Sequence, residues 1–392
     1  MRVANKKILM ITTLFPSEER PYYCIYLLQL FDAVKALGYH VDILMPDESL
    51  PDGVIKQTEY RGYTITHIGY SGNLFMGIAG AVSSGFSQEL RKFLGSQKPN
   101  IINIHFGSTA VCKAVISNAN KMEIPTVMHY HGLNVFKDYY VAHPLLEKVL
   151  YANKVWLTNH ADAIVGVSNK VCQIVSAKSR NDSVYTVYNG VDTRLFYPSE
   201  IKKNPVFTIV CVANLIPIKG HEYLLRAARD VIFNHGYNLK IKLIGNGPER
   251  KRLQELAEEL GIENAVEFLG EQDYGVVAEE IRNADFYIMP SYFESLGCVY
   301  LEAMASGVAA LGIKGCGIDE IITDKKNGYL AEPHNTEQIT ERILYAIENP
   351  EEHARIAMAG YDHVINQYQW VHAAQSLARV YEEILHGSKD YA

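Results

Sequence analysis

The sequence predicts an α/β protein of two domains, each built on a parallel β-sheet with helices on both faces. A chain of 392 residues is too long for one ordinary hydrophobic core. Short apolar runs alternate with amphipathic stretches along most of its length, which is the pattern of strands joined by helical crossovers. The alternation starts again after a polar, proline-containing stretch at residues 197–205, which is typical of a linker between domains.

The first half of the chain holds apolar runs short enough to be strands that are buried on both faces. These predicted strands are residues 7–13, 40–45, 101–104, 126–130, 163–167 and 184–187. The amphipathic stretches at residues 26–37 and 86–94 are predicted as helices between them. This order predicts a Rossmann-like sheet.

The second half repeats the pattern. Its predicted strands are residues 207–212, 240–244, 265–268, 286–289 and 309–312, and its predicted helices are residues 223–234, 249–260 and 299–305. We therefore assign residues 1–198 to an N-terminal domain and residues 199–365 to a C-terminal domain. Residues 366–392 are expected to be helical. A crossing of this segment back to the N-terminal domain is one of the arrangements that the sequence leaves open.

Composition narrows the class of protein. A hydrophobic content of 48% with 21% charged residues is typical of a folded globular chain. No dense basic run with interleaved aromatic residues occurs, so nucleic-acid binding is not expected. The six cysteines are scattered without a C-x-x-C pair, which suits a cytoplasmic protein better than a disulfide framework or structural zinc. No apolar run approaches the ~18 residues of a membrane helix.

Residues 136–156 combine aromatic side chains with lysines, and two readings are open. The stretch could rest on a membrane surface, or it could be an amphipathic helix that covers the core, which is the favoured reading. The small positive charge of residues 1–200, against the acidic residues 201–392, supports a peripheral contact with the inner face of the plasma membrane and an anionic, lipid-linked acceptor.

The segment at residues 284–307 carries the most functional information. It is predicted as a buried strand, a turn containing Gly297, and a helix. Free backbone N–H groups of residues 295–299 at a helix N-terminus favour a phosphate. Glu294 precedes this helix and Glu302 lies on it, and a carboxylate can accept hydrogen bonds from vicinal hydroxyls. On spacing alone, Glu294 as a helix cap and Glu302 as a solvated helix residue remain equally well supported.

This Glu-x7-Glu pattern resembles the signature of the retaining nucleotide-sugar glycosyltransferases of family 4, and the resemblance extends over nearly the whole chain. It implies the GT-B architecture, in which two Rossmann-like domains face each other across an interdomain cleft. It also implies that Glu302 binds the donor ribose and Glu294 the transferred sugar. The diphosphate and sugar hydroxyls would be held by the backbone of Ser295, Leu296, Gly297 and Cys298.

A second motif at residues 212–220 directly follows a predicted strand. Lys219 in this loop could neutralise a diphosphate leaving group, although such a lysine alone is more often an ordinary surface residue. The resemblance implies an arginine and a lysine here. Lys219 matches the lysine, whereas Asn214 stands in the place of the arginine and can donate a hydrogen bond without supplying charge.

Two further loops border the implied donor. Residues 245–247 contain G-x-G without a third glycine, so a plain strand-to-helix turn is the default reading. The resemblance places this loop, with Gly245, beside the nucleotide base. It also places the loop at residues 315–320, with Glu320, next to the donor.

The acceptor side is expected in the N-terminal domain. His129 and His131 share one face of a predicted strand, but no suitable partner is evident in the sequence, so no metal site is predicted. The resemblance implies that His131 touches the donor sugar at the cleft mouth. It also matches His105, for which a structural role stays open. Cys24 occupies a place where relatives have glycine, and is expected to reshape the acceptor mouth as a packed thiol.

The chain contains no Asp-x-Asp, so the divalent-metal grip on a diphosphate used by other glycosyltransferases has no obvious ligands. The resemblance implies a retaining, metal-independent hexosyltransferase without a cofactor, acting from a nucleotide sugar, with UDP favoured, on a saccharide or lipid-linked acceptor. Surface polysaccharide or glycolipid biosynthesis is the expected setting. Two alternatives are a nucleotide-sugar epimerase or hydrolase of the same fold, and a non-catalytic nucleotide-sugar-binding partner.

Overall fold

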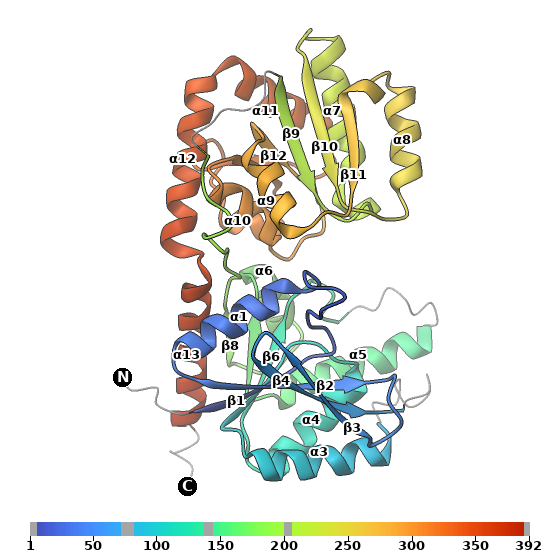
Figure 1. The fold of residues 1–392 in the computed structure, drawn as a ribbon, viewed down its shortest axis with the longest axis vertical. Helices are drawn as coiled ribbons and strands as arrows, with labels where there is room; N and C mark the ends of the chain where they lie inside the picture. The colour runs from blue at the N-terminus through green and yellow to red at the C-terminus, as the bar shows by residue number, and fades with distance from the viewer. Residues whose placement is uncertain (1–5, 72–81, 137–143, 200–205, 388–392) are drawn as a thin grey trace. The chain divides into compact units, whose positions relative to one another are not determined.

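The computed structural model describes residues 6–71, 82–136, 144–199 and 206–387, and divides the chain into two compact units (Figure 1). The N-terminal unit comprises Met1–Tyr188 with Trp370–Ala392, and the C-terminal unit comprises Asn189–Gln369. The change from one unit to the other thus lies before the predicted domain boundary at residue 198. A hydrogen bond of 2.9 Å from the Val191 N–H to the Tyr368 carbonyl ties the start of the C-terminal unit to its end.

The N-terminal unit contains an eight-stranded sheet in the order β3-β4-β2-β1-β5-β6-β7-β8. Its strands are β1 (Lys7–Ile11), β2 (His40–Asp47), β3 (Ile55–Tyr60), β4 (Tyr63–Gly69), β5 (Ile101–Ile104), β6 (Thr126–Tyr130), β7 (Ala163–Gly166) and β8 (Val184–Thr186). Only β3 is antiparallel to its neighbour among these described strands. The hairpin β3–β4 was not predicted, because β3 is a mostly exposed edge strand with a polar sequence.

Both faces of this sheet are buried under helices. The helices are α1 (Ile25–Ala36), α3 (Ser84–Gln97), α4 (Thr109–Lys121), α5 (Pro144–His160), α6 (Asn169–Ser176) and α13 (Trp370–Gly387). Ile8 and Met10 of β1 pack with α1 and α13, whereas Leu9 and Ile11 pack with α3 and α4. Alternate residues of one strand therefore enter different cores, which explains why the parallel strands read as continuous apolar runs.

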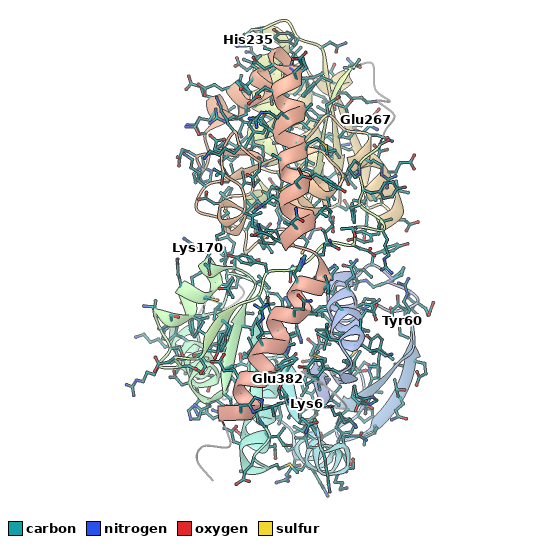
Figure 2. The ribbon with its side chains drawn as sticks, turned by 90° about the vertical axis from the view of Figure 1, so that its left-hand side faces the viewer. Lys6, Tyr60, Lys170, His235, Glu267 and Glu382 are labelled. Atoms are coloured by element: carbon teal, nitrogen blue, oxygen red, sulfur yellow. The ribbon has the colours of Figure 1, made fainter. Side chains whose placement is uncertain are left out.

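Helix α13 is part of the N-terminal core although it lies at the far end of the sequence. Its Leu377 and Tyr381 are fully buried, and the Asn103 side chain donates a hydrogen bond of 2.7 Å to the Tyr381 hydroxyl. At the surface, Lys6 and Glu382 form an ion pair of 2.6 Å (Figure 2). The predicted helical segment at residues 366–392 thus contains the last two residues of α12 (Pro350–Gln367) and helix α13, which belongs to the N-terminal unit.

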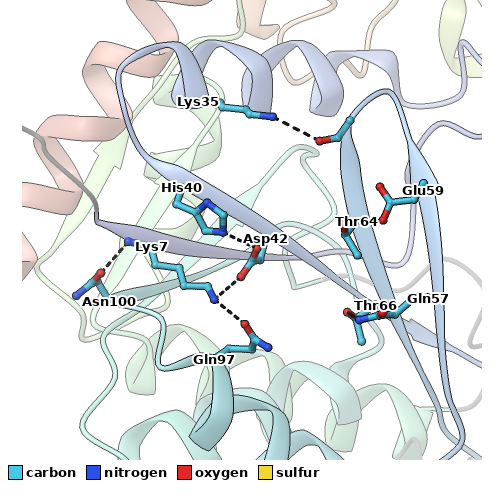
Figure 3. Close-up of polar contacts among 11 residues, drawn as sticks. Lys7, Lys35, His40, Asp42, Gln57, Glu59, Thr64, Thr66, Gln97 and Asn100 are labelled. Atoms are coloured by element: carbon cyan, nitrogen blue, oxygen red, sulfur yellow. Dashed lines mark hydrogen bonds and ion pairs between the residues drawn. The ribbon is translucent and has the colours of Figure 1, made fainter.

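Polar contacts fix the start of β1 at the amino edge of the same sheet (Figure 3). The Lys7 ammonium lies 2.8 Å from Asp42 and donates a hydrogen bond of 2.6 Å to Gln97. The Lys7 backbone N–H donates to Asn100 at 2.7 Å. One residue therefore links β1 to β2, to the end of α3 and to the loop before β5.

The C-terminal unit contains a six-stranded sheet in the order β11-β10-β9-β12-β13-β14, and the pairings between these described strands are all parallel. The strands are β9 (Phe207–Val212), β10 (Leu239–Ile244), β11 (Val266–Gly270), β12 (Phe286–Ile288), β13 (Ala309–Ile313) and β14 (Tyr329–Ala331). The predicted fold class, two Rossmann-like parallel sheets covered by helices, is confirmed. Strand β14 was not predicted.

The helices of the C-terminal unit follow the strands in turn. They are η1 (Pro217–Lys219), α7 (His221–Phe233), α8 (Arg250–Glu259), η2 (Glu263–Ala265), α9 (Tyr274–Arg282), α10 (Cys298–Ala305), η3 (Gly317–Glu320), α11 (Thr336–Glu348) and α12 (Pro350–Gln367). The loops after β9, β10, β12 and β13 all leave the carboxyl edge of the sheet, which is the edge where ligands bind in such folds.

Candidate functional site

Lys219 and Glu294 form an ion pair at the carboxyl edge of the C-terminal sheet. The Lys219 Nζ lies 2.5 Å from the Glu294 Oε2, and the two side chains are only 18% and 13% exposed. Lys219 ends η1 after β9, and Glu294 lies in the loop after β12, the strand next to β9. Because adjacent parallel strands share a carboxyl edge, the fold brings these distant residues together. The pair combines a cation suited to a phosphate with a carboxylate suited to sugar hydroxyls.

Backbone contacts hold the two loops of this pair in register. The Tyr292 N–H and the Ser291 hydroxyl each donate a hydrogen bond of 3.1 Å to the Ile218 carbonyl. Gly220 has a φ of 71°, and a Cβ at this position would lie 2.2 Å from the Pro290 carbonyl oxygen. Only glycine permits this approach, so the position of Lys219 depends on it.

Helix α10 begins beside the ion pair. Its N-cap is Gly297, with a φ of 79°, a residue that has no side chain to cap the helix. The N-cap position is therefore not occupied by Glu294, which lies three residues earlier. Leu296 is buried, so that residue can offer a ligand only its backbone. The start of α10 favours an anion through its N–H groups and the helix dipole.

Glu302 lies inside the unit, on α10. It is 6% exposed and accepts a hydrogen bond of 2.7 Å from the Tyr274 hydroxyl through Oε1. Burial raises the pKa of Glu302 to about 7, although the Tyr274 hydrogen bond opposes this rise. The alternative reading of Glu302 as a solvated helix residue is thus wrong. A carboxylate that is kept in a dry site without a cationic partner is typical of a ligand-binding group.

The loop after β10 packs tightly against the loop that holds Asn214. Gly245 has a φ of 132°, and a Cβ there would lie 2.1 Å from the Ala213 carbonyl oxygen. The Leu215 N–H donates a hydrogen bond of 2.9 Å to the Asn246 carbonyl. The structure thereby brings Asn214, which is exposed, next to Gly245.

The loop after β13 contacts the Glu294 loop directly. The Gly317 N–H donates a hydrogen bond of 3.0 Å to the Glu294 carbonyl. A Cβ at Gly317 would lie 1.7 Å from the Ser295 carbonyl oxygen. From the sequence, only the family resemblance placed the loop at residues 315–320 beside the donor. In the structure, backbone atoms bring this loop into direct contact with the Glu294 loop.

Replacement of Gly317 by alanine is expected to destabilise the protein by about 1–3 kcal/mol, because the new methyl group collides with backbone rather than with a movable side chain. The free energy of unfolding in urea measures this loss. Gly275→Ala is the matched control: it lies in α9 of the same unit, and a Cβ there has no atom within 4 Å, so alanine should be neutral or stabilising. Equal stabilities of the two variants would contradict the close approach at Gly317.

Two contacts of this site have no sequence motif. Tyr274, which bonds Glu302, is the first residue of α9, and nothing in the sequence around it marks a function. The Asn189 side chain donates a hydrogen bond of 3.2 Å to the Cys298 sulfur, and burial raises the pKa of this thiol to about 12. Cys298 is therefore a neutral thiol. The contact with the donor that is predicted for this residue is made by its backbone.

The predicted acceptor-side residues lie in the N-terminal unit. His105 follows β5, His131 follows β6, and their rings are linked by a hydrogen bond of 3.0 Å from Nδ1 to Nε2. The ring of Tyr26 on α1 lies 5.4 Å from that of His131, centroid to centroid. Cys24 immediately precedes α1 and has a φ of 53° and a ψ of 36°, a left-handed conformation that favours glycine. The structure thus gives Cys24 a backbone conformation that suits the glycine implied at this place by the family resemblance.

Replacement of Cys24 by glycine is expected to raise the free energy of unfolding by about 0.5–1 kcal/mol. The left-handed conformation costs a residue with a Cβ roughly 1–2 kcal/mol, and the greater freedom of glycine in the unfolded chain offsets part of this gain. Urea titration measures the change. Cys24→Ala keeps the strain and removes the thiol, so a gain with alanine as large as that with glycine would sink the explanation.

Part of the aromatic stretch at residues 136–156 lies outside the described residues. Helix α5 uses Leu150 and Leu157 to cover the core, while Val149 and Tyr151 are exposed. Among the helices that the structure describes, none is long and apolar enough to cross a membrane.

Comparison with known proteins covers most of the chain. Residues 25–195 match the family described as Glycosyltransferase Family 4, and residues 194–363 match Glycosyl transferases group 1. The relatives include enzymes with named activities. The N-acetyl-alpha-D-glucosaminyl L-malate synthase of Bacillus anthracis is 25% identical over 74% of this chain and 76% of its own length. A GDP-mannose-dependent alpha-(1-6)-phosphatidylinositol monomannoside mannosyltransferase of Mycolicibacterium smegmatis is 28% identical over 59% and 64%.

A solved structure extends the likeness to the whole fold. HepE of Anabaena, in complex with UDP, superimposes with a TM-score of 0.73 and 16% identity, covering 96% of this chain and all of that one. At this identity the likeness shows the fold, and the fold is the GT-B type that the sequence predicted.

Proposed function

Because the chain belongs to the glycosyltransferases of family 4, we propose that it transfers a hexose from a nucleotide sugar to a saccharide or lipid-linked acceptor, with retention of the anomeric configuration. The observation that carries this proposal is the Lys219–Glu294 pair beside the start of α10, with the buried Glu302 on the same helix. Cation, N–H groups and two carboxylates match the diphosphate, the sugar and the ribose of such a donor.

Each group has a distinct task in the proposed reaction. Lys219 and the first N–H groups of α10 hold the diphosphate and stabilise the charge that grows on it as the glycosidic bond breaks. Glu294 accepts hydrogen bonds from the sugar and orients it, without forming a covalent bond. The departing phosphate oxygen receives the proton of the acceptor hydroxyl, which attacks from the same face of the sugar. His131 of the N-terminal unit remains the proposed contact to the sugar.

The proposals for the nucleotide and the pathway draw on the related proteins. UDP is favoured, and the GT-B neighbour from Anabaena contains it. The mannosyltransferase relative is named for a phosphatidylinositol acceptor, which supports an acceptor linked to a lipid and work in glycolipid or surface polysaccharide synthesis. Action at the inner face of the plasma membrane would follow from such an acceptor.

The test is a panel of UDP, GDP and ADP sugars, each incubated with and without saccharide and lipid-linked acceptors. Product that forms only with an acceptor, with the donor's anomeric configuration by NMR, supports the proposal. Free sugar or an isomerised nucleotide sugar without acceptor would instead identify a hydrolase or an epimerase. Nucleotides that raise the melting temperature without any turnover would identify a non-catalytic binding protein.

A further inference from the structure

Three histidines gather at the carboxyl edge of the N-terminal sheet. His129 and His131 lie on one face of the end of β6, and Ile104 of β5 pairs with Met128 of β6, so that His105 comes to lie beside them. The rings of His129 and His131 are stacked 4.4 Å apart, with 9° between their planes. One ligating atom from each of the three histidines can be chosen so that all lie within 4.8 Å of one another.

These histidines are not satisfied by the surrounding protein in the usual way. His105 and His129 are 3% and 1% exposed. Among the described residues, His105 Nε2 and both ring nitrogens of His129 have no hydrogen-bond partner. A buried polar atom without a partner destabilises the folded state, and native proteins leave few of them. Three such atoms in two adjacent imidazoles indicate that the cluster serves a ligand rather than packing.

The chemical state of the rings suits a metal ion. Neutral imidazole is the form of histidine that binds metal ions, and burial of the ring favours this neutral form. A cavity of about 320 Å³ borders all three rings, which gives an ion access and leaves room for water.

We propose that His105, His129 and His131 bind a divalent transition-metal ion, for which Zn²⁺ is the first probe. Zinc–nitrogen distances of about 2.0–2.1 Å in a tetrahedral site put ligand nitrogens roughly 3.4 Å apart. His105 Nδ1 and His131 Nε2, at 3.0 Å, are already near this spacing. His129 must rotate out of its stack to complete the site. Three protein ligands leave the fourth position to water.

This site goes beyond the proposed transfer reaction, in which His131 alone of the three histidines has a proposed contact with the donor sugar. The sequence argued against a metal because His129 and His131 lacked a third ligand. His105 supplies it only through the pairing of β5 with β6. Metal binding also leaves the second nitrogen of each ring available, so a contact of His131 with a sugar is not precluded.

The experiment uses the full chain without a polyhistidine tag. Metal content is measured by mass spectrometry after purification, and Zn²⁺ is then titrated into chelator-treated protein against a competing chromophoric chelator. One metal per chain and a melting temperature that rises with Zn²⁺ and falls again with EDTA are expected. His105→Gln and His129→Gln should each weaken binding by about 100-fold or more, since even the partners of metal ligands are worth about 10–100-fold. His160→Gln, an exposed histidine of the same unit, should bind as the wild type does.

Failure of a variant to fold would leave the wild-type protein as the decisive sample. Loaded with Co²⁺ or Zn²⁺, it should show a coordination shell of three imidazole nitrogens by X-ray absorption. The proposal is overturned if Zn²⁺, Co²⁺ and Cu²⁺ all fail to bind at one per chain, if the shell contains fewer imidazoles, or if both glutamine variants bind like the wild type. None of these outcomes depends on glycosyl transfer, so the proposed function stands or falls separately.

Discussion

Alanine at Lys219 or at Glu294 is expected to abolish sugar transfer, with a loss of at least about 10²–10³-fold in kcat, the range for removing one preorganised electrostatic group. Lys219→Ala removes the side-chain cation that would neutralise the leaving diphosphate. Glu294→Ala removes the carboxylate that would accept hydrogen bonds from the sugar and orient it. Because the pair is largely buried, each single change also leaves one charge uncompensated, and stability should fall as well. Initial rates and urea unfolding are measured on both variants.

The double variant Lys219→Met/Glu294→Gln separates these two effects. It removes both charges at similar volume, so stability should recover most of the loss, because no uncompensated charge remains. Activity should not recover. Lys242 and Glu280 provide a matched control, since they form an ion pair of 2.5 Å in the same unit with exposures of 16% and 22%. Lys242→Met/Glu280→Gln should keep wild-type transfer. Full activity in Lys219→Ala and in Glu294→Ala would refute the proposed donor site.

The Glu302→Gln variant is expected to differ from the wild type in how stability depends on pH. The folded-state pKa of Glu302 is about 7 against 4.5 for the free side chain. A raised pKa stabilises the folded protein fully below the unfolded value and loses this contribution as pH rises through the folded value. The wild type should therefore lose up to about 3 kcal/mol between pH 4.5 and pH 8 relative to the variant. Urea unfolding across this range measures the difference.

Exposed Glu259 of the same unit is the control, and its glutamine variant should have the same stability profile as the wild type at every pH. Parallel profiles for the wild type and Glu302→Gln would show that Glu302 is not the titrating group.

The affinity for the nucleotide should change with pH in the opposite direction to the stability. Only the ionised carboxylate accepts hydrogen bonds from both ribose hydroxyls, so the affinity of the wild type should rise between pH 6 and pH 8, and that of the variant should stay flat.

The predicted strands correspond closely to the structure because strands buried on both faces must be apolar throughout. Residues 101–104 and 126–130 were predicted with the bounds that β5 and β6 have. The hairpin β3–β4 escaped prediction for the converse reason: β3 is exposed, and its turn consists of Arg61 and Gly62 with φ values of 45° and 78°. Arginine is not a residue that signals such a turn.

The candidate site likewise contains some residues that the sequence reveals and others that it does not. Glu294, Glu302 and Lys219 could be found because each lies in a recognisable strand–loop–helix segment. Their surroundings could not, because partners such as Tyr274 and Asn189 come from other elements. Burial decided the reading of Glu302, and it depends on how α9 and α10 pack. The third histidine beside His129 likewise follows from strand pairing, which a motif search along the chain does not reveal.

Helix α13 has a consequence for how the protein is made. The sheet face under Leu377 and Tyr381 belongs to strands near the start of the chain, and Asn103 meets Tyr381 across 278 positions. At about 5–20 residues per second, a ribosome needs on the order of tens of seconds to synthesise this interval. The N-terminal sheet must wait that long with one face only partly covered, while the C-terminal unit, which is continuous in sequence, can fold first. During synthesis, the N-terminal unit is thus the natural client of a chaperone.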